Sequence, residues 1–143
     1  MSGKYGANQY KKTSIQTASR GQILILLYEA AIKNLKKAAQ SIEQNDLSAK
    51  GQAIGKTHDI INELAVTLDF EAGGQIAQDL ERLYHYMSGE LIQANAQNSP
   101  EKLRNIQKLL ETLLEGWRQA VAQTQNISSS TSSTAQSEKT GGN

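Results

Sequence analysis

The chain has no cysteine, a single proline and few aromatic residues (5%) among its 143 residues. Without cysteine, disulfide bonds, thiolate metal sites and thiol catalysis are excluded, and a reducing compartment is compatible with the chain. Strands favour aromatic residues and the turns between them favour proline, so the scarcity of both argues against an all-β domain. The composition therefore favours helices.

The chain also lacks an excess of charge of one sign and any long apolar run. It has 15 basic and 14 acidic residues, a formal net charge of +1, so no global field attracts nucleic acid or an anionic membrane. No apolar run approaches the ~18 residues that span a bilayer, and no signal-peptide pattern is visible. We therefore expect a soluble cytoplasmic protein that neither binds nucleic acid nor inserts into a membrane.

Four segments carry apolar residues at helical spacings of three and four, at about residues 19–45, 47–68, 75–98 and 100–125. Ser19, Asp46 and Ser99 are suited to cap the first, second and fourth of these helices, and Pro100 suits a first helical position. Short connections make consecutive helices neighbours. The pattern therefore predicts an all-α fold, an antiparallel four-helix bundle.

One apolar stripe on each helix is expected to form the core of the bundle. Its main members are Leu24, Tyr28, Leu35, Leu47, Ile54, Ile61, Leu64, Ile76, Leu80, Met87, Leu91, Leu103, Ile106, Leu110, Trp117 and Ala120. The polar residues 1–18 show no sustained period and are expected to form an extended or short-helical N-terminal segment. The Ser/Thr-rich residues 126–143 have little to bury, which predicts a disordered tail.

The run from Ile23 to Tyr28 is apolar all the way round a helix, because six positions at about 100° each cover every direction. Leu24, Leu27 and Tyr28 fit the core stripe. Ile23, Ile25 and Leu26 lie off this stripe, so the core of the bundle is not expected to bury them. Together with apolar residues that lie off the other stripes, these predict a groove for a partner, formed by Ile23, Ile25, Leu26, Val66, Tyr86 and Ile92. Such a groove also suits pairing with a second copy, which leaves a weak homodimer open.

The residues that could take part in catalysis or metal binding do not have the spacing that these functions require. Gly51 and Gly55 precede Lys56, but a phosphate-binding loop needs four residues between its glycines and follows a strand. A helix with two small residues that allow close packing is the better interpretation. His58 and His85 lack the Glu-x-x-His spacing of a metal-binding bundle. We expect no catalytic residue, no metal, no cofactor and no enzyme activity, and keep a phosphorelay bundle using His85 or a generic helical adaptor as alternatives.

Several blocks of the sequence then resemble a known family. Residues 10–19 (YKKTSIQTAS) lead into residues 23–32 (ILILLYEAAI), and later blocks follow in order: 60–69 (IINELAVTLD), 73–77 (GGQIA), 83–87 (LYHYM), 91–95 (LIQAN) and 117–118 (WR). Over about residues 5–122, their order and spacing are similar to the flagellar secretion chaperone family FliS. One departure is Arg20, which stands where FliS sequences usually have proline.

The resemblance implies a cytosolic chaperone dedicated to flagellar type III export, with no catalytic activity. FliS-like proteins bind the C-terminal segment of flagellin, prevent its premature polymerisation and dock on the export-gate protein FlhA. Tyr10 matches a tyrosine of the family's N-terminal signature. We hypothesise that the segment around Tyr10 and Ile15 covers the apolar groove until flagellin displaces it, and that it contributes to docking at the export gate.

Overall fold

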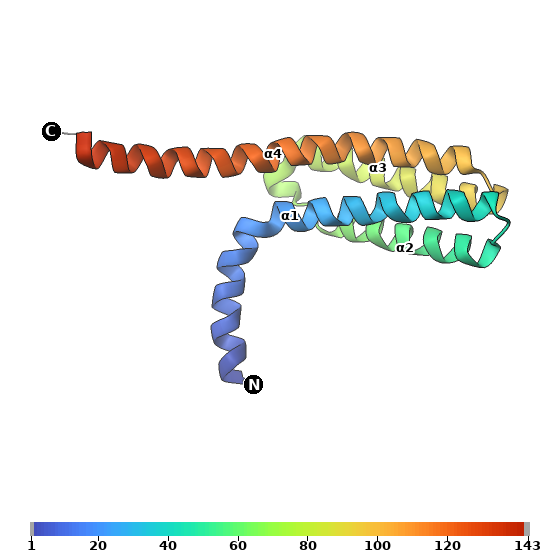
Figure 1. Cartoon of the computed structure of the whole chain (residues 1–143), viewed down its shortest axis with the longest axis horizontal. Helices are drawn as coiled ribbons and strands as arrows, with labels where there is room; N and C mark the ends of the chain where they lie inside the picture. The colour runs from blue at the N-terminus through green and yellow to red at the C-terminus, as the bar shows by residue number, and fades with distance from the viewer. Residues whose placement is uncertain (1, 142–143) are drawn as a thin grey trace.

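The computed structural model describes the backbone of residues 2–141 and the side chains of residues 20–124. The fold is all-α, as predicted. Its four helices run antiparallel (Figure 1) and are α1 (Ser2–Glu43), α2 (Leu47–Val66), α3 (Phe70–Gln97) and α4 (Pro100–Gly141). In the described backbone, α1 begins at Ser2 and α4 ends at Gly141, so both helices run through the segments that the sequence predicts to be extended or short-helical (residues 1–18) and disordered (residues 126–143). The side chains of these two segments lie outside the described range.

The helices form a ring in chain order. α1 packs against α2 and α4, and α3 packs against the same two helices, so that α1 and α3 face each other across the diagonal. Among the described residues, none of these helices combines the length and the apolar character needed to cross a membrane.

The core takes one apolar stripe from each helix, as the sequence predicts. Its large side chains with less than 2% exposure come from all four helices and include Tyr28, Leu35, Ile61, Leu64, Met87, Leu91, Leu103, Ile106 and Leu110. Burial of each such side chain stabilises the fold by about 1.5–3 kcal/mol relative to leaving it exposed. The core thus runs the length of the bundle and fixes which helix faces point outward.

Two residues of the connection between α1 and α2, Asn45 and Asp46, end one helix and begin the next. Asn45 adopts the left-handed conformation (φ 57°), which ends α1, and the Asp46 carboxylate accepts a hydrogen bond from the Ala49 backbone N–H at 3.1 Å. One turn later, Lys50 is buried, and its Nζ donates to the Asn95 carbonyl (3.1 Å) and the Asn98 side chain (2.5 Å). These bonds tie the start of α2 to the end of α3.

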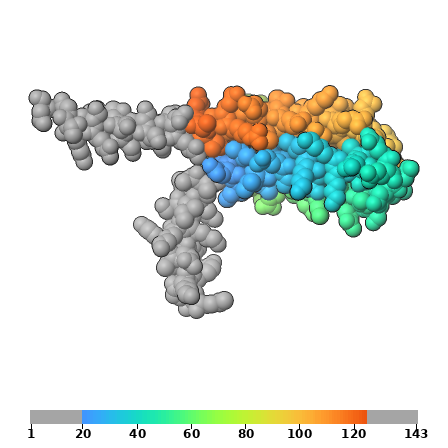
Figure 2. Space-filling model, in the orientation of Figure 1, coloured from blue at the N-terminus to red at the C-terminus, as the bar shows by residue number. Residues whose placement is uncertain are grey.

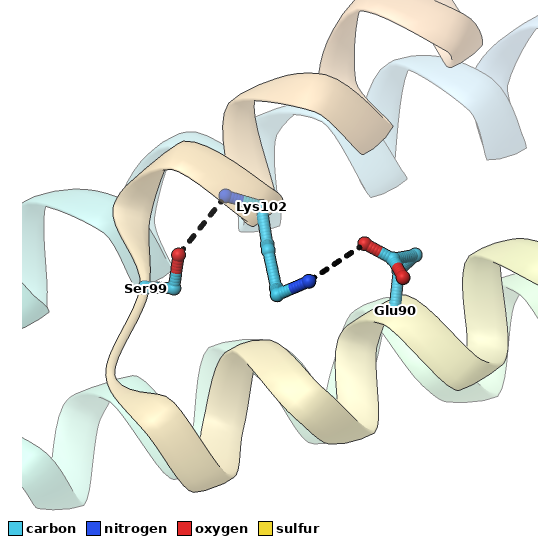
Figure 3. Close-up of polar contacts among 3 residues, drawn as sticks. All are labelled: Glu90, Ser99 and Lys102. Carbon is cyan, nitrogen blue, oxygen red and sulfur yellow. Dashed lines mark hydrogen bonds and ion pairs between the residues drawn. The ribbon is translucent and has the colours of Figure 1, made fainter.

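The connection between α3 and α4 shows the expected cap (Figure 3). The Ser99 hydroxyl accepts a hydrogen bond from the Lys102 backbone N–H at 3.2 Å, and Pro100 is the first residue of α4. The Lys102 ammonium reaches back to the Glu90 carboxylate of α3, with 3.4 Å between Nζ and Oε2. A serine cap and an interhelical ion pair therefore hold the two helices at this end.

The corner between α2 and α3 differs from the sequence-based prediction, because α3 begins at Phe70 and not near residue 75. Asp69 caps α3 by accepting from the backbone N–H groups of Glu71 (3.1 Å) and Ala72 (3.0 Å), so a helical turn forms before the two glycines. Gly74 then interrupts the helix with φ 50° and ψ −122°. Only glycine adopts this conformation without steric cost, so Gly74 sets the direction of the rest of α3.

Four sequence-based assignments are wrong. Leu47, Ile76 and Ala120 were expected in the core, yet all three are exposed. The buried position in the first turn of α2 is Lys50, and the one after the break at Gly74 in α3 is Ala77, so the packed face differs from the apolar spacing there. Ala120 lies beside an open cavity. Gly51 and Gly55 do not allow close packing either, because a Cβ atom on either would meet no atom within 4 Å.

Candidate functional site

Exposed apolar side chains gather at the end of the bundle that holds the α2–α3 corner. On α1, Ile23 is 48% and Leu26 is 63% exposed, and Val66 in the last turn of α2 is 80% exposed. Phe70 in the first turn of α3 is also exposed. Scattered single exposed apolar residues are common on protein surfaces, but a group at one end suits an interaction.

An open cavity of ≈730 Å³ lies beside these side chains. Its lining comes from the early part of α1, from Thr67 and Asp69 at the corner, and from α4. The apolar part of the lining consists of Ile23, Leu24, Leu27, Trp117, Ala120 and Val121. Concave, mostly apolar sites of this size are typical places for partner side chains to bind.

The α1 and α4 walls of the cavity approach each other closely at one edge. Gly21 of α1 faces Val121 of α4, and a Cβ atom on Gly21 would overlap the Val121 side chain. The absence of a side chain at Gly21 therefore lets the helices approach at the edge of the cavity. The position of this wall depends on one glycine and one valine.

Polar groups lie in the core beneath Trp117. The hydroxyls of Tyr28 and Tyr84 are hydrogen-bonded to each other, and both residues are buried. Burial raises the pKa of both tyrosines, and for Tyr84 the neighbouring Tyr28 raises the pKa further. The buried Trp117 indole N–H lies beside Tyr28, but its geometry falls short of a hydrogen bond.

The predicted groove residues do not form one continuous site. Ile23, Leu26 and Val66 lie at the end with the cavity, whereas Ile25 is half-buried and packs against the core. Its role as a contact residue remains a prediction. Ile25 is seven residues, or about two helical turns, before Ile32, so both lie on the side of α1 next to α4.

Tyr86 and Ile92 are exposed, as predicted, but they lie farther along α3. At 1.5 Å per residue, Ile92 is about 27 Å along the helix from the break at Gly74. A partner that touches both regions must therefore extend along the bundle. Tyr10 and Ile15 lie outside the range of described side chains.

Sequence reasoning missed the part of the site contributed by α4. Trp117 continues the α4 stripe with a regular spacing, which predicts a core position. It packs against the core and also lines the cavity. One sequence feature could have indicated this second role. Trp117 lies at the end of the apolar stripe, close to Ala120 and Val121, where the bundle ends at the α2–α3 corner.

The two histidines lie on the surface of α2 and α3. His85 is exposed, and the half-buried His58 lies 3.3 Å from the Asn62 side-chain nitrogen in the next turn. Within the part of the chain that the structure describes, no group of three or more His, Asp and Glu side chains comes together as a metal site would require.

Comparison with known proteins gives consistent matches. The model of the family described as "Flagellar protein FliS" matches residues 3–124. The chain is 38% identical to the flagellar secretion chaperone FliS of Salmonella typhimurium, over 76% of this chain and 81% of the relative. It is 32% identical to the protein of the same name from Vibrio cholerae, over 82% and 90%, and 30% identical to that from Bacillus subtilis, over 78% and 83%.

Proposed function

Because this chain belongs to the FliS family of flagellar secretion chaperones, we propose that it binds the C-terminal segment of flagellin in the cytosol. Binding would prevent premature polymerisation and aid delivery to the flagellar type III export apparatus through the export-gate protein FlhA. FliS is a family of chaperones and not of enzymes.

The observation that carries the proposal is the exposed apolar surface around the open cavity at one end of the bundle. Ile23, Leu26 and Val66 remain exposed there beside a cavity walled by Trp117 and Val121. An amphipathic segment that is disordered when free can fold onto such a surface, since burial of apolar area offsets the entropy lost on ordering.

A long client segment fits the separation between the two apolar regions. Tyr86 and Ile92 stand along α3, away from the cavity. Disordered segments that fold on binding are able to cover such extended surfaces. We therefore assign the cavity end to one part of the client and the exposed side of α3 to another.

The experiment that tests this proposal is calorimetric titration with monomeric flagellin, intact and lacking its C-terminal segment. We expect binding to intact flagellin only. Leu26→Asp should weaken it at least about tenfold, which is about 1.4 kcal/mol. Leu47→Asp is the matched control, because Leu47 is an exposed leucine (57%) at the other end of the bundle. Equal loss in both variants, or binding of the truncated flagellin, would contradict the proposed site.

We also propose that the N-terminal segment around Tyr10 and Ile15 covers the apolar surface when no client is bound and takes part in docking at the export gate. The exposed apolar side chains of Ile23 and Leu26 are the reason for proposing a covering segment. Deletion of residues 1–17 should increase the binding of a hydrophobic dye and tighten the binding of flagellin. Unchanged dye binding and unchanged client affinity would refute the covering role and leave the client site itself untouched.

A further inference from the structure

A second feature lies on another face of the bundle, along the seam between α1 and α4. The two helices lie side by side along the face shown in Figure 2, α1 in blue to cyan and α4 in orange. Two ion pairs cross this seam. Glu29 pairs with Arg118 at 3.2 Å, and Glu43 pairs with Arg104 at 3.4 Å.

These pairs fix the register of the charged residues between them. The same number of residues separates the two glutamates on α1 as separates the two arginines on α4. In this antiparallel register, Lys36 stands opposite Glu111, and Lys33 stands opposite Leu114, the residue next to Glu115. The seam therefore has a basic wall on α1 and an acidic wall on α4.

The opposite charges in the middle of the seam are not joined. Within residues 20–124, no ion pair connects the lysines of α1 with Glu111 or Glu115. Each glutamate instead accepts a hydrogen bond from a glutamine of its own helix, Gln107 at 3.5 Å and Gln119 at 3.4 Å. An exposed Lys–Glu pair is worth only about 0.2–1 kcal/mol, so leaving these pairs open costs little.

A cavity of ≈860 Å³ occupies the space between the open walls. Ile32 and Leu114, both nearly buried, give it an apolar floor, while Lys33, Lys36 and Lys37 line one side. From Glu29 to Gln40, the lined part of α1 is about 16 Å long, which equals three turns of an α-helix.

We propose that this seam is a second docking surface, separate from the client site, for a helix of a partner protein about three turns long. The apolar stripe of that helix would rest on Ile32 and Leu114. Acidic residues along one flank would meet the lysines of α1, and basic residues along the other would meet Glu111 and Glu115. Complementary charge of this kind sets the direction of the bound helix and speeds its association.

The test uses a designed, fluorescently labelled helical peptide with a leucine stripe, glutamates along one flank and lysines along the other. The control peptide has the same composition, with the two charges alternating on both flanks. Fluorescence anisotropy should show binding of the first peptide at least tenfold tighter than of the control, and the difference should shrink at high salt. Equal affinity of the two peptides would overturn the proposal.

Charge-reversed variants of the protein locate the site. K33E/K36E and E111K/E115K should each weaken the peptide at least tenfold, because each leaves two walls of the same charge. The quadruple variant should restore binding, because a helix turned end to end presents its flanks to the exchanged walls. Circular dichroism checks that each variant keeps its helices. Unchanged binding in the two double variants would show that the peptide binds elsewhere and would overturn the proposal.

A competition measurement tests whether the seam is separate from the client site. An excess of the flagellin C-terminal segment should leave the affinity for the designed peptide unchanged. Displacement of the peptide would show that the seam belongs to the client surface and would overturn the assignment of a second docking site.

Discussion

At the scale of single residues, the hydroxyls of Tyr28 and Tyr84 form a buried polar pair in the core. They come from α1 and α3, the two helices that face each other across the diagonal, and their hydrogen bond joins these helices. A buried hydroxyl without a partner costs about 1–3 kcal/mol, whereas removal of both partners is nearly neutral. The pair therefore favours one arrangement of the two helices over alternatives.

This pair predicts a loss of stability in alkaline solution. The folded protein raises the pKa of both tyrosines above the ordinary value of 10.0. Their contribution is therefore fully present below pH 10, and it is lost as the pH rises further, because the unfolded chain releases these protons more readily. Urea unfolding from pH 8 to 11 should show the decline.

Phenylalanine variants separate the hydroxyl pair from other alkaline effects. Tyr28→Phe alone should cost about 1–3 kcal/mol, because it leaves the Tyr84 hydroxyl buried without its partner. The Tyr28→Phe/Tyr84→Phe double variant should regain most of that loss and show a smaller alkaline decline. An undiminished decline in the double variant would assign the effect to other groups.

At the scale of the helices, the glycines of α2 and α3 have different roles. Gly55 lies in the interior of α2 with open space around it, whereas Gly74 breaks α3 with a positive φ. The first glycine is a weakness in a regular helix. The second is required by the direction that α3 takes after the corner.

Alanine substitutions at these two glycines should therefore have opposite effects. Gly55→Ala should stabilise the protein by about 0.5–1 kcal/mol, because alanine favours helix and meets no neighbour. Gly74→Ala should destabilise it by more than about 1 kcal/mol, because alanine disfavours φ 50°. Thermal unfolding of the two variants measures both changes. A stabilised Gly74→Ala variant would show that the break is not needed for packing.

At the scale of the whole molecule, the sequence predicts the bundle well because apolar spacing and caps are local signals. Asp46 and Ser99 cap the helices expected from their side chains and positions. Leu47 and Ile76 follow the same spacing and are nevertheless exposed, because Lys50 and Ala77 take the buried positions in these turns. Which positions are buried depends on packing between segments far apart in the chain.

The candidate site was predictable only in part for a similar reason. Leu26 can be recognised from its own helix, since it lies opposite the core stripe. The role of Trp117 in the cavity wall and the alignment of Lys36 with Glu111 depend on how α4 is placed against α1. No pattern within a single helix contains that information.

The most direct test of the central claim uses Trp117, the single tryptophan of the chain, as a reporter in the cavity wall. A tryptophan-free C-terminal segment of flagellin is titrated into the protein while tryptophan emission is recorded. Because the bound segment removes water from the cavity, the emission should shift to shorter wavelength and saturate, and Leu26→Asp should move the midpoint at least tenfold. Binding measured by calorimetry with no change in Trp117 emission would place the client elsewhere and contradict the account.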